Sequence, residues 1–249
     1  MPDPSLLCQF DGPIARLTLN DPERANVLSD AMMAQLSQAL AELAADPTVR
    51  VIVLGAAGRV FCAGHDLGEL QAAGDRAEAV FARCSALMQA IVACPKPVIA
   101  RVQGAAVAAG CQLVASCDLA YSVDTARFAV SGINLGLFCS TPGVALARAV
   151  GRKDALELLL TGRFAGAAEA AAMGLINRAV PAAELDAVVD QAAQAVAAKA
   201  PDAIALGKRV FNRQAELPLE GAYAVASAAM AENLGFASAA TGIAAFLKR

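Results

Sequence analysis

Hydrophobic positions along the first 180 residues alternate between patterns typical of strands and patterns typical of helices. Residues 28–46 place apolar side chains at helical spacing after Ser29, which is suited to cap the first turn. Short alternating or β-branched runs indicate strands, which we expect at residues 14–20, 49–55, 98–104, 118–123, 127–130 and 174–180. We expect helices at residues 28–46, 76–93, 109–117, 141–150, 152–161 and 166–173.

The last third of the chain, residues 182–249, is Ala-rich and predicts helices alone, with breaks at Pro201 and Pro218. Alternating strands and helices followed by helices define an α/β fold with a helical C-terminal extension. Few charges occur near the chain end, in residues 235–249. We therefore expect this extension to pack against a neighbouring subunit in preference to its own core.

The charge and aromatic content of the chain exclude some classes of binding partner. The net charge is −3, only 4% of residues are aromatic and Trp is absent, which argues against nucleic acid and against anionic membranes as partners. Residues 102–117 and 128–147 are uncharged, but polar residues, glycines and a proline interrupt them, so neither predicts a membrane span. The first residues lack a secretory-signal pattern.

Seven scattered cysteines and a single histidine predict no metal site, because no pair forms a C-x-x-C motif. We interpret the thiols as buried and reduced. The predicted location is accordingly cytoplasmic, in a bacterial cytosol or in a reducing organelle matrix.

Two loops have the composition of an anion-binding turn, with small residues between a strand and a helix. They are "VFCAGHDL" (60–67) and "GAAVAAGC" (104–111). Free backbone N–H groups at such turns can converge into an oxyanion hole. The alternative is that small residues only permit tight packing of strand on helix, and these residues alone leave both interpretations open.

Four segments in order resemble the enoyl-CoA hydratase/isomerase (crotonase) family: "LNDPERANVLS" (19–29), "FCAGHDLGEL" (61–70), "KPVIARVQGAAVAAGCQLVASCDLAYS" (96–122) and the run 128–181. Within the family, "GINLGLFCSTPGVALARAV" most resembles the subgroup of enoyl-CoA hydratase domain-containing protein 3. The resemblance implies a spiral of ββα units in a core of residues 1–195. It also implies a helical trimerisation region, residues 196–249, and a homotrimer or a dimer of trimers.

The resemblance further implies an acyl-CoA substrate, with coenzyme A as part of that substrate and no separate cofactor. Family members hold the thioester oxygen with two backbone N–H groups, which correspond here to His65 and Ala109. Residues implied in binding the substrate and its CoA portion are Arg24, Ala25, Ala63, Gly64, Asp66, Leu67, Gly110 and Lys248.

The chain departs from the family at both catalytic carboxylates. Hydratases use two glutamates, one to activate water and one to supply a proton, and these positions are Gln112 and Gly132 here. In the following segment, "LFCSTP", the candidate groups are Cys139 and Ser140, and the favoured interpretation of Cys139 is an inert, packed thiol. The imidazole of His65 is the general base nearest to the hole in the sequence.

Three functions are compatible with these residues. The first is an acyl-CoA lyase of the enoyl-CoA hydratase type, active in fatty acid metabolism, whose oxyanion hole stabilises a thioester enolate but whose chemistry is altered. The second is a catalytically weak acyl-CoA binder. The third is a thioester hydrolase or decarboxylase of the same fold, using the hole with Cys139, Ser140 or a bound water.

Overall fold

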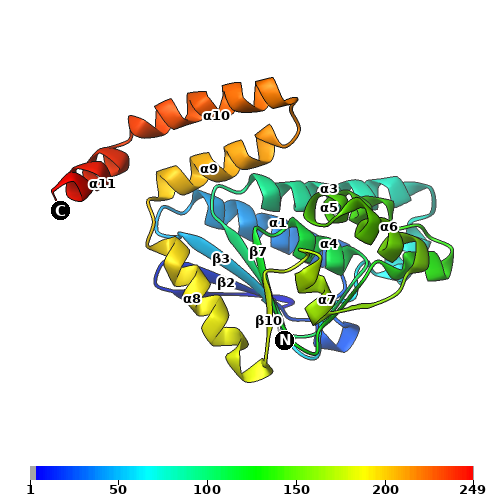
Figure 1. Cartoon of the computed structure of the whole chain (residues 1–249). Coiled ribbons are helices and arrows are strands. Elements are labelled where there is room, and N and C mark those ends of the chain that lie inside the picture. The colour runs from blue at the N-terminus through cyan, green and yellow to red at the C-terminus, as the bar shows by residue number, and fades with distance from the viewer. Residues whose placement is uncertain (1–3, 249) are drawn as a thin grey trace.

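The computed structural model describes residues 4–248 and contains two β-sheets (Figure 1). The larger sheet has six strands, which in spatial order are β1 (Leu6–Asp11), β2 (Ile14–Leu19), β3 (Val51–Ala56), β5 (Val98–Val102), β7 (Leu119–Val123) and β10 (Arg178–Val180). β1 runs antiparallel to β2, and the other neighbouring strands are parallel. Every residue of β3 is buried, as expected for a central strand of a covered parallel sheet.

The smaller sheet has four strands, in the order β4 (Val60–Cys62), β6 (Ala105–Val107), β8 (Arg127–Ala129) and β9 (Ala165–Gly166). Three successive pairs, β3 with β4, β5 with β6 and β7 with β8, each place their first strand in the larger sheet and their second in the smaller. A helix follows each of the first two pairs. This repetition is the spiral of ββα units that the family resemblance implies, and the α/β fold class is confirmed.

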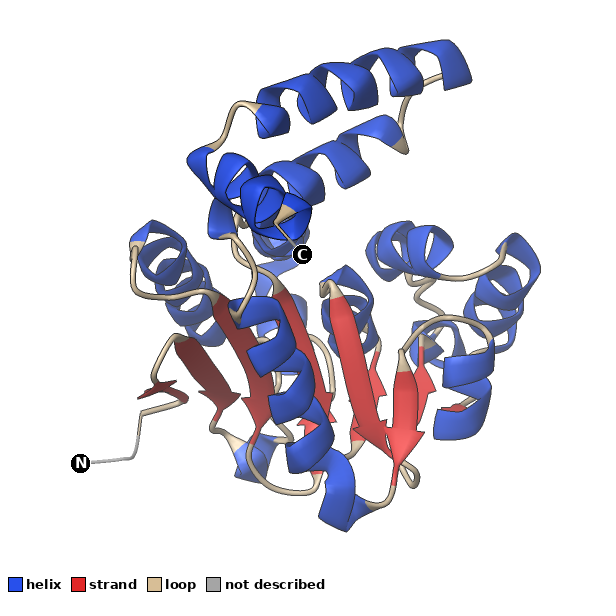
Figure 2. Ribbon diagram, turned by 60° about the vertical axis from the view of Figure 1, so that its left-hand side comes forward, coloured by secondary structure: helices blue, strands red, loops and turns tan. Residues whose placement is uncertain are grey.

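The α-helices, in chain order, are α1 (Asp30–Ala45), α2 (Leu67–Ala73), α3 (Ala77–Ala93), α4 (Ala109–Ser116), α5 (Ser140–Ala149), α6 (Arg152–Thr161), α7 (Ala167–Ala172), α8 (Leu185–Ala197), α9 (Pro201–Gln214), α10 (Leu219–Leu234) and α11 (Ala237–Leu247). Short 3-10 turns are η1 (Pro22–Arg24), η2 (Gly74–Arg76), η3 (Ser131–Leu135) and η4 (Ala182–Glu184). Ser29 caps α1 as predicted, since its hydroxyl accepts the N–H of Met32 at 3.2 Å. α8 packs against the larger sheet, and Figure 2 shows it crossing in front of the strands.

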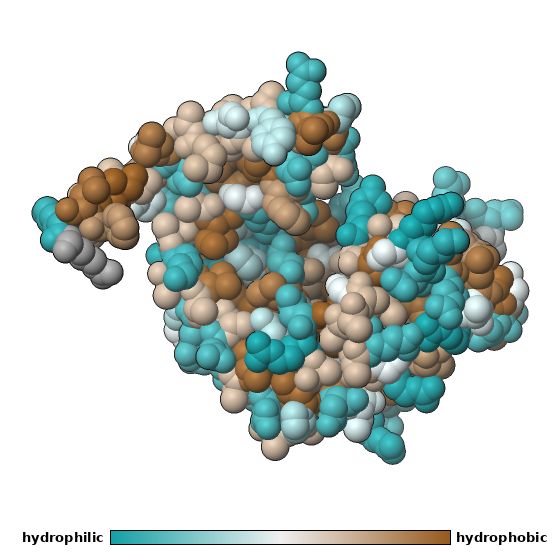
Figure 3. All heavy atoms as spheres, in the orientation of Figure 1, coloured by the Kyte–Doolittle hydropathy of each residue, from teal (hydrophilic) through white to brown (hydrophobic). Residues whose placement is uncertain are grey.

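The helices α9, α10 and α11 lie apart from the sheets and contact one another (Figures 1 and 2). The boundary predicted after residue 195 falls in the last turn of α8, just before this group. In Figure 3, the segment that projects from the molecule at the position of α11 has a largely apolar surface. Large apolar side chains exposed on α10 and α11 are Leu219, Tyr223, Met230, Leu234, Ile243, Phe246 and Leu247.

The structure adds several elements that hydrophobic patterns do not reveal. The stretch between the strand expected over 49–55 and the helix expected over 76–93 contains β4 and α2. The strand expected over 98–104 divides into β5 and β6, and β10 begins only at Arg178. β1 and β9 were not expected, nor was the break between α10 and α11. The strands β4, β6, β9 and β10 have two or three residues, too short to display a period, and only their pairing with distant strands defines them.

The cysteine thiols are free, and five of them are buried. Cys8 contradicts the expectation of burial, because it lies on the edge strand β1 and is exposed. Across residues 4–248, no helix is both long enough and apolar enough to cross a membrane.

Candidate active site

A cavity of about 640 Å³ lies between the two loops singled out in the sequence and the segment 131–142. The predicted site residues that line it are Arg24, Ala63, His65, Asp66, Leu67, Ala109, Gly132, Cys139 and Ser140. The structure therefore brings together residues from four separate stretches of chain. Its remaining lining is largely apolar and includes Val27, Leu70, Phe81, Leu135, Leu137 and Phe138, which no motif in the sequence marks as site residues.

The first loop follows β4 and is held against the segment that precedes α1. The N–H of Ala63 donates to the carbonyl of Ala25 at 3.0 Å, and the N–H of Leu28 donates to the carbonyl of Gly64 at 2.7 Å. Gly64 has a φ of 93°, in the region that glycine adopts without steric cost. Ala25 and Gly64 do not line the cavity themselves, and they shape the loop that does.

The second loop joins β6 to α4 and carries an unusual backbone conformation. Ala108 has φ 50° and ψ −117°, a combination that L-residues adopt only with strain. In the first turn of α4, a Cβ on Gly110 would lie only 2.2 Å from the carbonyl oxygen of Cys62. The absence of a side chain at Gly110 thus lets the start of α4 press against the end of β4.

This close approach brings the first loop against the start of α4 at the cavity. A methyl group on Gly64 would lie 3.1 Å from the amide nitrogen of Ala109, so loop one abuts the first turn of α4. Within residues 4–248, the N–H groups of His65 and Ala109 donate no hydrogen bond. Both residues line the cavity, and buried backbone donors are rarely without a partner.

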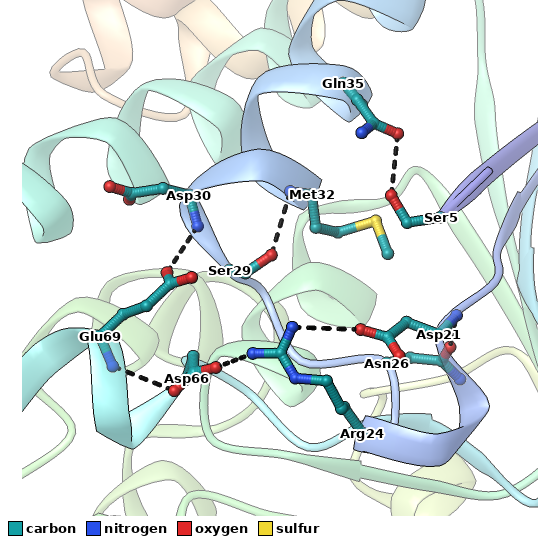
Figure 4. Close-up of polar contacts among 10 residues, drawn as sticks. All are labelled: Ser5, Asp21, Arg24, Asn26, Ser29, Asp30, Met32, Gln35, Asp66 and Glu69. Carbon is teal, nitrogen blue, oxygen red and sulfur yellow. Dashed lines mark hydrogen bonds and ion pairs between the residues drawn. The ribbon is translucent and has the colours of Figure 1, made fainter. Parts of the chain in front are cut away.

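A polar network fastens the first loop from its outer side (Figure 4). Arg24 forms ion pairs with Asp66 and, at 3.5 Å, with Asp21. Asp66 caps α2 by accepting the N–H of Glu69 at 3.0 Å, and Glu69 accepts the N–H of Asp30 at 2.8 Å. Hydrogen bonds from the Glu69 backbone, with the Arg24 charge nearby, hold the pKa of Asp66 below its ordinary value. Asp66 is therefore an ionised capping group rather than a proton donor at neutral pH.

The imidazole of His65 packs edge-on against the ring of Phe81, with centroids 5.4 Å apart. Its Nε2 is buried and has no partner among the described residues. Burial lowers the pKa of His65, and the charge of Asp30 opposes that shift. At neutral pH the ring is therefore uncharged, while the main chain of the same residue provides the free N–H.

Gln112 and Gly132, the positions that the resemblance matches to the family's glutamates, differ in their surroundings. Gln112 is 4% exposed, does not line the cavity and leaves its Oε1 without a partner among the described residues. Gly132 does line the cavity, but a side chain there would lie 2.5 Å from the carbonyl oxygen of Leu137. The backbone around residue 132 therefore has no room for a glutamate.

Cys139 and Ser140 begin α5 at the edge of the cavity. The Sγ of Cys139 accepts the N–H of Gly132 at 3.3 Å, and burial raises the pKa of this thiol. Ser140 is exposed, and its hydroxyl makes only a 3.5 Å contact with the carbonyl of Phe138. Lys248, which follows α11, does not line the cavity, and in Figure 1 α11 lies on the opposite side of the molecule from α5.

The comparisons with known proteins agree with this architecture. The family model described as Enoyl-CoA hydratase/isomerase matches residues 9–249. The chain belongs to the enoyl-CoA hydratase/isomerase family. The resemblance to the subgroup of enoyl-CoA hydratase domain-containing protein 3 is also confirmed by a curated relative. That relative, the mitochondrial protein of this name from Homo sapiens, is 45% identical over 100% of this chain and 82% of its own length.

Solved structures extend the agreement to three dimensions. A crystal structure of enoyl-CoA hydratase from Mycobacterium smegmatis is 51% identical and superposes with a TM-score of 0.97, covering 99% of this chain and 97% of that chain. The crystal structure of human enoyl Coenzyme A hydratase domain-containing protein 3 gives a TM-score of 0.95 at 44% identity, with 98% of both chains covered.

Proposed function

We propose that the protein is an acyl-CoA thioester-binding enzyme that stabilises a thioester enolate in a backbone oxyanion hole. The observation that carries this proposal is that the N–H groups of His65 and Ala109 donate to no group within residues 4–248, in two adjoining loops at an apolar cavity. Such donors stabilise charge as it develops on the thioester oxygen, and removal of one typically costs about 10²–10³ in rate. We propose no cofactor beyond the coenzyme A of the substrate.

The reaction is proposed to differ from two-glutamate hydration. Gln112 is an uncharged amide and Gly132 has no side chain, so neither supplies the acid or the base that hydration uses. Among the described residues that line the cavity, Asp66 is the one carboxylate, and it is already paired with Arg24. The same observation favours a second candidate function, a binder of acyl-CoA with weak or no turnover.

The CoA portion is proposed to lie along the outer part of the first loop. Arg24 and Leu67 line the cavity there, and both are more than half exposed. A CoA phosphate would compete with Asp66 and Asp21 for the Arg24 guanidinium, which suits bidentate phosphate binding.

A homotrimer, or a dimer of trimers, is proposed to cover the apolar side chains of α10 and α11, because so large an apolar surface is rarely left exposed in monomers. Lys248 could then reach a CoA phosphate only across a subunit boundary. The predicted compartment, a bacterial cytosol or a reducing organelle matrix, is compatible with relatives that are mitochondrial by name.

Gly64→Ala tests the oxyanion hole. The added methyl group would lie 3.1 Å from the Ala109 nitrogen and would strain a backbone with φ 93°. We expect binding of butyryl-CoA, measured by calorimetry, to weaken by about tenfold or more, equivalent to about 1.4 kcal/mol. Gly12→Ala is the matched control, because Gly12 also has a positive φ and no atom lies within 4 Å of the added methyl group.

Turnover separates the two candidate functions. Loss of the enoyl-thioester absorbance of crotonyl-CoA over many cycles per chain would support an enzyme. Binding without turnover across a panel of acyl-CoA esters would support the binder. If no acyl-CoA ester binds, or if Gly64→Ala and Gly12→Ala bind equally well, the proposed hole is wrong.

A further inference from the structure

The thiol of Cys139 occupies the space that the side chain of residue 132 would need. A Cβ on Gly132 would lie 2.8 Å from the Sγ of Cys139, well inside van der Waals contact. The N–H of Gly132 donates to the same sulfur at 3.3 Å. Where the family carries its second glutamate, this chain therefore presents a cysteine sulfur held from a different part of the backbone.

Cys139 lies at a cavity that also contains free backbone donors. Cys139 lines the same cavity as His65 and Ala109, whose N–H groups have no partner within residues 4–248. Ala109 is buried, and because a buried backbone N–H normally has a hydrogen-bond partner, its free N–H points to a ligand oxygen. A nucleophilic atom and two oxyanion donors thus share one chamber, the arrangement that addition to a conjugated carbonyl compound requires.

We propose that Cys139 adds to the β-carbon of an α,β-unsaturated acyl thioester held in this cavity. The ligand class rests on the proposed function, whereas the covalent step does not follow from it. In this step a bond forms between Sγ and Cβ, and the π bond between Cα and Cβ breaks. The electron pair moves to the thioester oxygen, which the N–H groups of His65 and Ala109 stabilise, and the thiol proton ends on Cα.

Two features act on the Cys139 thiol in opposite directions. Burial raises its pKa and so disfavours the thiolate, and the proton that ends on Cα starts on the sulfur. The Gly132 N–H and the first turn of α5 favour negative charge on sulfur as the proton leaves. A saturated thioester has no electrophilic β-carbon, and in this cavity it can only bind.

The other thiols provide internal controls. Cys62 and Cys111 are buried and do not line the cavity. Cys8 is exposed on β1 and also does not line the cavity. A non-specific reaction of thiols with an electrophile would therefore favour Cys8, whereas reaction in the cavity would favour Cys139.

The proposal is tested on the wild-type protein by incubation with crotonyl-CoA, followed by intact-protein mass spectrometry and peptide mapping. We expect one adduct per chain, with the mass of the whole acyl-CoA, located on Cys139. Butyryl-CoA should give no adduct, and an excess of it should slow the reaction by competing for the cavity.

Two variants sharpen the result. Cys139→Ser should abolish the adduct, because a serine hydroxyl is far less nucleophilic, while Cys8→Ser should react like the wild type. Circular dichroism establishes that both variants fold. Labelling of Cys8 in preference to Cys139, or butyryl-CoA binding with no adduct from crotonyl-CoA, overturns the proposal alone. Failure of either ester to bind overturns the proposed function and removes the ligand on which this inference depends.

Discussion

The two ends of the cavity differ in what supplies their polar groups. At the proposed thioester end, His65 and Ala109 contribute backbone N–H groups that remain available whatever side chain each residue carries. At the proposed acyl end, Gly132 lines the cavity without a side chain, and the sulfur of Cys139 lies beside it. A main-chain site thus persists through side-chain replacement, whereas a site built from side chains changes its chemistry with each substitution.

The substitution Gly132→Glu introduces a carboxylate at the proposed acyl end. Of the substitutions considered, it has the largest expected effect on the free energy of unfolding. Its Cβ would lie 2.5 Å from the Leu137 carbonyl oxygen and 2.8 Å from the Cys139 sulfur. We expect a loss of about 1–3 kcal/mol in the free energy of unfolding, from overpacking, and no gain of crotonyl-CoA hydration. Urea denaturation and the enoyl-thioester absorbance measure the two results.

Gly166→Glu is the control for that variant, because nothing lies within 4 Å of a Cβ at Gly166. Its stability should change by no more than about 0.5 kcal/mol, as is usual for surface substitutions. A stable Gly132→Glu protein that hydrates crotonyl-CoA would show that the backbone near Leu137 adapts readily. The contrast between the two ends would then not hold.

Ala108→Gly sharpens the picture of the thioester end. Ala108 holds φ 50° and ψ −117° next to the Ala109 donor, at a cost of roughly 1–3 kcal/mol. Glycine removes this strain, but it also raises the conformational entropy of the unfolded chain, which lowers the stability of the folded protein by roughly 0.5–1 kcal/mol. We expect a net gain of about 1 kcal/mol in urea denaturation.

Ala115→Gly is the control, because Ala115 lies inside α4 in ordinary helical backbone. We expect this variant to lose about 0.5–1 kcal/mol in the free energy of unfolding. Equal destabilisation by Ala108→Gly and Ala115→Gly would mean that the backbone at residue 108 stores no strain. The second loop would then be as relaxed as the first, in which a glycine occupies the positive-φ position.

The smallest effect concerns the His65 side chain. Burial lowers its pKa in the folded protein, so as pH falls below the ordinary value of 6.5 the unfolded chain binds a proton first. Stability should therefore decrease as pH falls from 6.5 through the folded pKa. His65→Asn, which keeps the main-chain donor, should lose that part of the slope in melting temperatures measured between pH 7 and pH 5. His65 is the only histidine. If the melting temperatures of both proteins depend on pH in the same way, the pKa of His65 is the same in the folded and unfolded protein, and burial does not lower it.

Much of the fold was predictable because its larger elements carry their own pattern. The helix after Ser29 and the buried strand β3 are visible in the spacing of apolar residues, and the structure contains both. The strands β4 and β6, which lead into the two site loops, are three residues each and are defined only by pairing across the chain. The candidate residues of the site could be named from sequence, but the contacts between them could not.

The sequence by itself determined the α/β class, the family and the presence of an amide at Gln112 and no side chain at Gly132, since these depend on residue identity and short-range spacing. Only the tertiary structure decided that the Ala109 amide abuts Gly64, that Ala108 is strained, that Gln112 is outside the cavity lining and that the Cys139 sulfur fills the space beside Gly132. Each of these depends on segments far apart in the chain packing to within a few ångströms. Such packing is set by the whole core, and local residue patterns do not encode it.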